Sequence, residues 1–249
     1  QQDGSQIAYK ILEPSNPKNI ENEIPLILII GLWSVKEEFI GLEEVIIFDN
    51  RGIGESSVAS SDDPISLYLM AKDTIALIKH LGIKHFNLFG WSMGGLIALN
   101  VALNVPSDLN LEKLVICSTS IQPPPPSAFY HILYDLPKPP DPLKNVQEQK
   151  DEIMRAFEKC FTDYMLEHPE ILDKLAEIQF NSHRPFEIFK RQWEAIKGID
   201  LISKVQTIET PTLLLHGDSD EILPITEAEL IASKIPNIKF IKLSNAGHM

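Results

Sequence analysis

Short runs of β-branched and aliphatic residues alternate along this chain with longer stretches whose apolar residues recur at helical spacing. Continuous apolar runs bounded by turn residues are typical of strands buried in a parallel sheet. We expect such strands at residues 6–12, 25–30, 45–48, 86–89, 113–117, 211–215 and 239–243. Because helical patterns separate most of these runs, the sequence predicts an α/β fold with a mostly parallel central sheet and helices on both faces.

The clearest helical pattern follows the third of these strands. Its apolar positions share one helix face and comprise Leu67, Met70, Ala71, Ile75, Ile78 and Leu81. Asp62 or Asp63 can cap its first turn beside Pro64, and Gly82 ends it. A further helix is expected from about residue 96 to 103, after the fourth strand.

The alternation breaks at a run of four prolines, residues 123–126, and only helical patterning follows as far as about residue 206. We therefore expect a helical insertion over residues 122–206 that separates two parts of one core domain, residues 1–121 and 207–249. The prolines favour a stiff, extended entrance to this insertion. An amphipathic helical block over the strand ends would form a lid, whereas the alternative is a structural excursion away from any chemistry.

The chain has 249 residues, of which 44% are hydrophobic and 23% are charged, as expected of a globular protein with a sizeable core. Its net charge of −13 argues against nucleic acid or an anionic membrane surface as a partner, since both require basic patches. The longest apolar run, residues 24–33, contains a proline and a glycine and is too short to span a membrane. An acidic surface is common among soluble proteins and by itself names no partner.

Two cysteines, Cys117 and Cys160, form neither a metal-binding spacing nor a disulfide framework, which favours a reducing, cytoplasmic setting. The histidines outside the candidate site show no ligand spacing either, so we predict no metal and no cofactor. Because the chain begins with Gln1 rather than methionine, we expect the native N-terminus to lie upstream.

The sequence Gly90-Trp91-Ser92-Met93-Gly94 stands between the fourth strand and the helix after it. A G-x-S-x-G motif in this context is typical of a nucleophile elbow, in which a tight turn pushes the serine into strained backbone geometry. Glycines are needed beside the turn because only a hydrogen side chain avoids a clash there. The motif therefore predicts Ser92 as a catalytic nucleophile, the alternative being a glycine-rich turn without chemistry.

Two loops at later strand ends supply groups that could activate Ser92. A serine hydroxyl is a poor nucleophile until a base takes its proton and a third group orients that base. His216, Asp218 and Asp220 follow the strand at 211–215, and His248 follows the last strand. The order serine, carboxylate, histidine is the order expected for a serine elbow in this type of sheet.

Four motifs together resemble those of the α/β-hydrolase superfamily. They are Asp3-Gly4, the Asp-x-Arg-Gly-x-Gly-x-Ser block at residues 49–56, the elbow at residues 90–95 and the ending Gly247-His248. The chain is similar to the serine-nucleophile branch that includes esterases, lactonases and perhydrolases. This resemblance implies a serine esterase that cleaves carboxylic esters, lactones or related small acyl substrates without a cofactor.

The resemblance also distinguishes the candidate acids. The family pattern Gly-x-x-Asp-x-x-x-Pro aligns with Gly217, Asp220 and Pro224. It therefore favours Asp220 over Asp218 as the carboxylate that orients His248. His216 directly precedes this loop, and we expect it to fix the loop rather than act as the base.

The same resemblance places the oxyanion hole at the backbone N–H groups of Met93 and Leu32, with Trp33 as the alternative to Leu32. Ile30 stands where the family usually has a histidine, and backbone donors survive that change. The block at residues 49–56 is expected to be structural, with a buried polar cluster formed by Asp49, Arg51 and Ser56.

Two lengths depart from the family pattern. The stretch from residue 31 to 45 is shorter than usual, and the chain ends at Met249 where the family adds a closing helix. A histidine one residue from a chain end would lie on a frayed terminus. We therefore expect further residues beyond Met249, and also between residues 31 and 45.

The candidate substrate-binding residues are aromatic: Trp33, Trp91, Phe157, Phe161, Phe186, Phe189 and Trp193. They predict a preference for apolar acyl groups, although those within the insertion could instead form the core of a lid. Two other functions stay open at this point. One is acyl transfer to an alcohol or to peroxide on the same catalytic residues, and the other is ligand binding without catalysis on a hydrolase scaffold.

Overall fold

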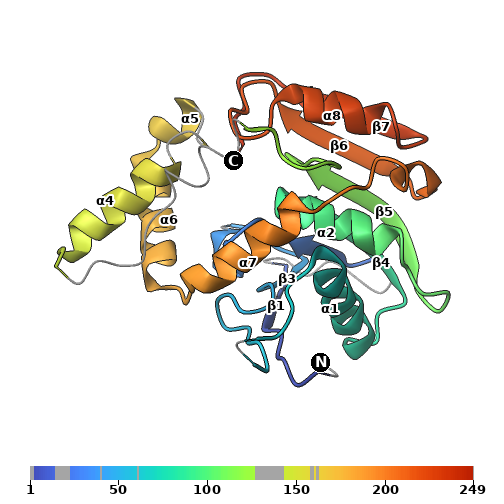
Figure 1. The fold of residues 1–249 in the computed structure, drawn as a ribbon, viewed down its shortest axis with the longest axis horizontal. Helices are drawn as coiled ribbons and strands as arrows, with labels where there is room; N and C mark the ends of the chain where they lie inside the picture. The colour runs from blue at the N-terminus through green and yellow to red at the C-terminus, as the bar shows by residue number, and fades with distance from the viewer. Residues whose placement is uncertain are drawn as a thin grey trace.

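A computed structural model describes residues 3–14, 23–39, 41–60, 62–126, 143–157, 160 and 163–248. Its strands join in one sheet in the order β1-β3-β2-β4-β5-β6-β7 (Figure 1). Their bounds are β1 (Tyr9–Leu12), β2 (Leu26–Ile29), β3 (Val45–Phe48), β4 (His85–Trp91), β5 (Asn110–Cys117), β6 (Thr212–Gly217) and β7 (Ile238–Leu243). Only β1 pairs antiparallel with its neighbour, and every other pairing is parallel. The predicted α/β fold with a mostly parallel sheet is confirmed.

The described helices follow the strands in the alternation that the sequence predicts, with a helical block between β5 and β6. Their bounds are α1 (Leu67–His80), α2 (Met93–Ala102), α4 (Val146–Phe157), α5 (Asp163–Leu166), α6 (Pro169–Asn181), α7 (Phe186–Lys197) and α8 (Ile225–Ala232), with short 3₁₀ helices η1 (Lys36–Glu38) and η3 (Val205–Thr207). None of the described helices is long and apolar enough to cross a membrane.

The predicted N-cap of α1 is wrong. Ser66 caps this helix, because its side chain accepts the N–H of Leu69 at 3.1 Å. Asp63 closes an earlier turn instead, where its carboxylate accepts the N–H of Ser60 at 2.8 Å. Pro64 therefore precedes the helix rather than starting it.

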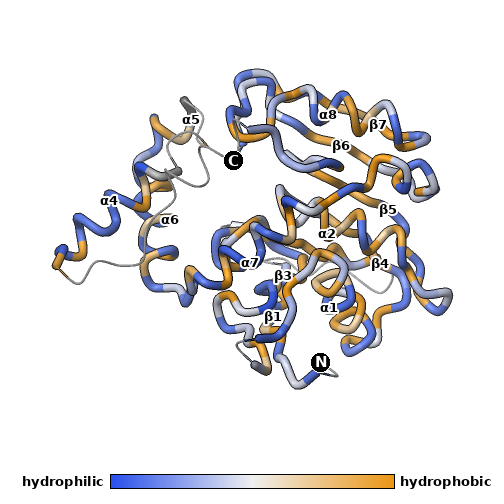
Figure 2. Tube along the Cα trace, viewed as in Figure 1, coloured by the Kyte–Doolittle hydropathy of each residue, from blue (hydrophilic) through white to orange (hydrophobic). Residues whose placement is uncertain are grey.

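The main hydrophobic core lies between one face of the sheet and α1, α2, α7 and α8. Figure 2 shows the central strands and α2 as largely hydrophobic along their length. The other face carries a smaller cluster formed by Leu28, Val45 and Ile47. Because the side chains of β4 alternate between buried and partly buried, the helices cover one face of this strand more completely than the other.

Helices of the predicted insertion fall into two groups. α7 belongs to the main core, since Phe189 and Trp193 are almost fully buried against it. In contrast, α4, α5 and α6 pack on one another beside the sheet, and α6 reaches η1 (Figure 1). One part of the insertion is thus built into the core, and a lid role for the other part remains a prediction.

The polar residues expected to form one cluster, Asp49, Arg51 and Ser56, are buried but belong to two separate sets of contacts. Arg51, which is 1% exposed, donates to both carboxylate oxygens of Asp73 at 2.9 and 2.7 Å. Asp49 instead accepts Lys36 Nζ at 2.6 Å, and its carbonyl accepts the Ser56 hydroxyl at 2.8 Å. Buried charges are tolerated only when they are paired, as Arg51 and Asp49 are here. Since Asp73 belongs to α1 and Lys36 to η1, these pairs join the loop after β3 to both helices.

Candidate active site

Ser92 lies at the turn between β4 and α2, in a backbone conformation that an L-residue rarely adopts (φ 55°, ψ −121°). Its N–H donates to the carbonyl of Cys117 at 2.9 Å. Its own carbonyl accepts the N–H of Gly95 at 2.9 Å and the hydroxyl of Thr119 at 2.8 Å. Strain of this kind costs about 1–3 kcal/mol and persists only where the surroundings enforce it, as these three hydrogen bonds do.

Glycines allow the elements around Ser92 to approach closely. A Cβ atom on Gly94 would lie 2.1 Å from the carbonyl oxygen of Ile29, and one on Gly90 would lie 2.3 Å from the carbonyl oxygen of Gly94. Neither distance is compatible with a side chain, because both obstacles are backbone atoms. The steric reason predicted for these glycines is confirmed.

His248 bridges the serine and one of the two candidate carboxylates. Its Nε2 lies 2.9 Å from Ser92 Oγ, and its Nδ1 lies 2.8 Å from Asp220 Oδ2. Because an ionised carboxylate can only accept, Nδ1 carries the proton and Nε2 accepts the hydroxyl proton of Ser92. Three groups from three separate strand ends thus form one hydrogen-bonded chain.

Asp220 is fixed as a charged acceptor. Its Oδ1 accepts the N–H groups of Ile222 and Leu223 at 2.9 and 2.8 Å. Burial alone would raise the pKa of this carboxyl, but the neighbouring His248 and the hydrogen bonds to the carboxylate outweigh it and hold the pKa below its usual value. Asp220 is therefore ionised at neutral pH despite its burial.

Asp218 joins two loops and does not contact His248. Its Oδ1 accepts the N–H of Asn245 at 2.8 Å, which ties the loop after β6 to the loop after β7. The same two loops approach at Gly217, where a Cβ atom would lie 2.1 Å from the carbonyl oxygen of Ala246. The structure therefore brings Asp220, rather than Asp218, to the histidine.

Two further side chains, His216 and Trp91, hold the segments that carry Asp220 and His248. His216 is fully buried, and its Nε2 donates to the carbonyl of Leu223 at 2.8 Å, on the loop that holds Asp220. Trp91 donates its indole N–H to the carbonyl of His248 at 2.9 Å, and the two rings lie 5.7 Å apart. The residue before the serine thus anchors the main chain of the histidine.

Leu32 and Met93, the predicted oxyanion donors, line a small cavity with Ser92. This cavity of about 40 Å³ is bounded by Leu32, Ser92, Met93, Leu96, Thr119, Ser120, Pro124, Trp193, Ile196, Ile222 and Leu223. The N–H of Trp33, the alternative donor, is occupied, because it donates to Gln192 Oε1 at 3.1 Å. Leu32 and Met93 therefore remain the better candidates for a role as donors.

The remaining aromatic candidates lie in different places. Trp193 lines the small cavity, whereas Phe186 and Phe189 stack on one another and pack against Trp33. Phe157 ends α4, and its side chain is not among the described ones. Phe161 lies outside the described residues.

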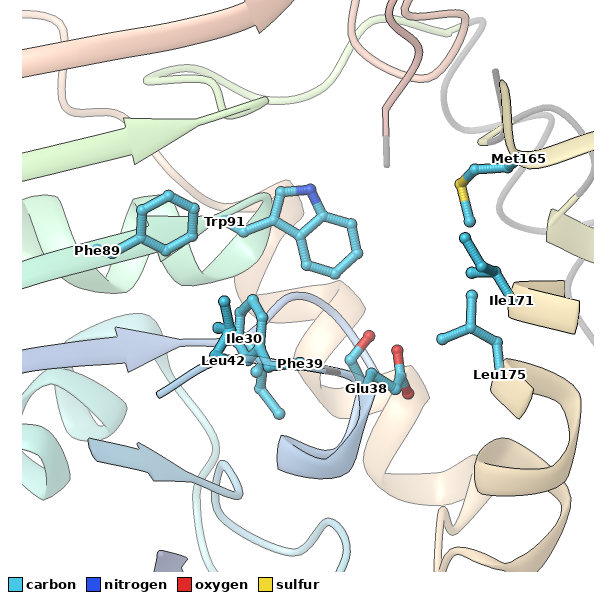
Figure 3. A pocket seen from close by; sticks show the side chains of 10 residues that line it. Ile30, Glu38, Phe39, Leu42, Phe89, Trp91, Met165, Ile171 and Leu175 are labelled. Atoms are coloured by element: carbon cyan, nitrogen blue, oxygen red, sulfur yellow. The ribbon is translucent and has the colours of Figure 1, made fainter. Parts of the chain in front are cut away.

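A larger pocket of about 370 Å³ is lined in part by Trp91. Figure 3 shows the Trp91 indole facing Met165, Ile171 and Leu175 across this pocket. The lining is mostly apolar and comprises Ile30, Ser34, Glu38, Phe39, Leu42, Phe89, Trp91, Met165, Ile171 and Leu175. It joins the strand ends to α5 and α6, so the outlying helices supply one wall.

One lining residue of the large pocket, Trp91, lies beside the serine. A Cβ atom on Gly31 would lie 2.8 Å from Trp91 Cζ3 and 3.3 Å from Ser92 Cβ, so the indole edge and Ser92 lie next to each other above Gly31. Glu38 is the charged group of the lining, and one of its oxygens accepts the N–H of Val35 at 3.1 Å. Burial raises the pKa of Glu38, against the opposing attraction of the Arg184 guanidinium.

Sequence reasoning missed the polar residues that support the site, chiefly Thr119, Arg184 and Gln192. A signal existed for Gln192, because it interrupts an apolar helix face shared by Phe189, Trp193 and Ile196. Thr119 and Arg184 carry no comparable pattern in the sequence. Among the described residues, no group of histidine, cysteine and acidic side chains could hold a metal ion.

Fold and site together define an α/β hydrolase. The family described as serine aminopeptidase, S33, matches residues 43–249, and the chain belongs to this family. RutD of Pseudomonas savastanoi pv. phaseolicola, named for a proposed carbamate hydrolase activity, is 26% identical over 209 residues, which are 82% of this chain and 76% of RutD.

Solved structures share the fold. A hydrolase from Pseudomonas aeruginosa PA01 superposes with a TM-score of 0.75 at 23% identity, over all of this chain and 89% of that one. The enol-lactonase from Burkholderia xenovorans LB400 also reaches a TM-score of 0.75, at 20% identity, over 97% of this chain and 89% of the lactonase. At these identities the likeness describes the fold alone.

Replacing Gly94 tests the close packing under Ser92. The substitution Gly94→Ala forces the backbone of α2 away from Ile29, so we expect a loss of at least about 2 kcal/mol in the free energy of unfolding. Urea unfolding followed by circular dichroism measures this loss.

Gly198→Ala is the matched control, because Gly198 has a φ of −89° and its nearest obstacle lies 3.8 Å from a new Cβ atom. We expect this variant to change the free energy of unfolding by less than about 1 kcal/mol. Equal stability of the two variants would show that α2 is not held as described.

Proposed function

We propose that this hydrolase cleaves carboxylic esters, lactones or related small acyl substrates through an acyl-enzyme on Ser92. The observation that carries the proposal is the hydrogen-bonded chain from Ser92 Oγ through His248 to Asp220, with steps of 2.9 and 2.8 Å. A nucleophile, a base in reach of its proton and an acid that orients the base are the parts that acyl transfer requires.

Acylation begins at Ser92. Its Oγ attacks the carbonyl carbon of the substrate while His248 Nε2 takes the hydroxyl proton, and the resulting imidazolium is stabilised by the ionised Asp220. The carbonyl oxygen becomes an oxyanion, for which the N–H groups of Met93 and Leu32 are the proposed donors. When the tetrahedral intermediate collapses, His248 returns the proton to the leaving alcohol oxygen.

Deacylation repeats these steps with water. His248 accepts a proton from the water while the water oxygen attacks the acyl carbonyl, and the same two N–H groups bind the second oxyanion. Collapse of this intermediate releases the carboxylic acid and returns the proton to Ser92 Oγ. Bonds and protons balance without a cofactor in this cycle.

The large pocket favours a substrate with an apolar part. Its volume of about 370 Å³ suits a medium-sized hydrophobic group, and its lining residue Trp91 lies beside Ser92. A carbamate carbonyl is open to the same attack by a serine, and the proposed activity named for RutD supports the inclusion of carbamates among the substrates.

Single substitutions in the hydrogen-bonded chain test the proposal. We expect Ser92→Ala and Asp220→Asn each to lower kcat for a nitrophenyl butyrate ester by about 1,000-fold or more, because each removes one part of a unit. Steady-state hydrolysis followed by nitrophenol absorbance measures the effect.

Asp218→Asn is the matched control for Asp220→Asn, since Asp218 lies in the same loop and accepts from Asn245 rather than from His248, and asparagine keeps the oxygen that accepts the Asn245 N–H. We expect this variant to keep kcat within about tenfold of the wild type, whereas Asp220→Asn lowers kcat about 1,000-fold. Turnover that survives in Ser92→Ala would contradict the proposal.

A second variant tests the assignment of the large pocket. Ile171→Trp adds a bulky side chain to the wall opposite Trp91 (Figure 3). We expect it to lower kcat/KM for a nitrophenyl octanoate ester at least about tenfold while changing kcat/KM for the acetate ester little, because only the longer chain needs the space.

Leu166→Trp is the control for this effect, because Leu166 is half-exposed at the end of α5 and does not line the pocket. Equal losses for octanoate and acetate esters in Ile171→Trp would place the acyl chain elsewhere.

A further inference from the structure

Helix α7 carries one buried amide on its apolar face. Gln192 is 0% exposed, and its neighbours Phe189 and Trp193 belong to the main hydrophobic core. Its Oε1 accepts the N–H of Trp33 at 3.1 Å, while its Nε2 is buried without a hydrogen-bond partner among the described groups. A buried amide is costly unless its hydrogen bonds are made, so the contact to Trp33 is the feature that distinguishes Gln192 from an apolar residue.

The Trp33 backbone is strained. Its φ of 57° is an outlier for a bulky residue, and such a conformation persists only where several contacts hold it. The segment leading into α7 supplies them, because the Trp33 indole N–H donates to the carbonyl of Arg184 at 3.0 Å and the Arg184 guanidinium lies 4.6 Å above the ring. Arg184 also donates to the Trp33 carbonyl at 3.5 Å, and Gln192 holds the other main-chain group, the Trp33 N–H.

This hydrogen bond fixes more than Trp33. Because a peptide unit is planar and trans, orienting the N–H of Trp33 also orients the carbonyl of Leu32 in the opposite direction. Leu32 in turn lines the small cavity with Ser92 and Met93. A rotation of the peptide between residues 32 and 33 would therefore turn the Leu32 carbonyl and shift the Leu32 residue, whose own N–H belongs to the preceding Gly31–Leu32 peptide.

We propose that Gln192 is a positioning residue for the oxyanion hole: by holding the Leu32–Trp33 peptide it fixes the loop after β2, and with it the preceding Gly31–Leu32 peptide, whose N–H is the proposed donor. This inference rests on the proposed function, in which Leu32 and Met93 bind the oxyanion. In this proposal α7 helps to shape the cavity beside Ser92, since Trp193, next to Gln192, also lines it.

A merely structural role and a positioning role for Gln192 predict different effects of its replacement on stability and on kcat. If Gln192 only filled space, methionine would fill it equally well without a buried amide, and activity would follow stability. If Gln192 orients the peptide, Gln192→Met leaves the fold stable while kcat falls. The expected fall is about 10–100-fold with KM within threefold, because a displaced donor costs somewhat less than a deleted one.

The experiment compares Gln192→Met, Gln192→Glu and the wild type for hydrolysis of a nitrophenyl butyrate ester and for inhibition by an alkyl boronic acid. A boronate bonded to Ser92 is tetrahedral and uses the oxyanion hole, so we expect its inhibition constant to rise by the same factor as kcat falls. Glutamate keeps an acceptor oxygen for the Trp33 N–H, and we expect Gln192→Glu to recover most of kcat. Thermal unfolding confirms that the variants are folded.

Thr74→Val is the control, because Thr74 is a fully buried polar residue of α1 that lines neither cavity and whose hydroxyl donates to the Met70 carbonyl of its own helix. We expect it to keep the kcat and boronate affinity of the wild type. A Gln192→Met variant with unchanged kcat and unchanged boronate affinity, or one in which only KM rises, overturns the inference. A wild-type protein that neither hydrolyses the ester nor binds the boronate instead overturns the proposed function.

Discussion

The close approach of α2 to β2 beneath Ser92 is the constraint on which the rest of the structure depends. Gly94 sits against the carbonyl of Ile29 with no room for a side chain, and the turn before it reaches a φ of 55°. Such a turn lifts Ser92 Oγ above the carboxyl ends of the parallel strands, where loops from other strands can reach it. The strain is held by Cys117 and Thr119, so β5 supports a residue that β4 and α2 present.

The second requirement is that the histidine loop extends far enough to bring His248 to Ser92. In the sheet order, β5 and β6 separate the serine at the end of β4 from the histidine loop after β7. The histidine crosses this distance on a loop fastened at both ends: Asp218 holds it near its start, and Trp91 holds the carbonyl of His248 beside the serine. Asp220 then meets His248 from the intervening strand end. The short distances within the hydrogen-bonded chain are thus a product of anchors outside it.

The sequence predicted those parts of the fold and the candidate site that depend on local pattern. Apolar runs and the G-x-S-x-G motif located the strands and the strained turn, because both arise from interactions among neighbouring residues. The meeting of Ser92, Asp220 and His248 was expected only through the family resemblance. Other contacts between distant segments were not predictable: Gln192 meets Trp33 across most of the chain, and helical periodicity is alike in α4 and α7 although only α7 enters the main core. The predicted cap of α1 was wrong for a different, local reason, since Asp63 is used by a preceding turn.

The central claim is that Ser92 reacts as a nucleophile activated by His248. The most direct measurement is mass spectrometry of the protein after reaction with a fluorophosphonate, followed by mapping of the modified peptide. We expect one phosphonate per chain, attached to Ser92, and none in a variant that lacks the His248 imidazole or the Ser92 hydroxyl. Ester hydrolysis by a protein whose Ser92 stays unmodified, or a label on another residue, would exclude Ser92 as the nucleophile.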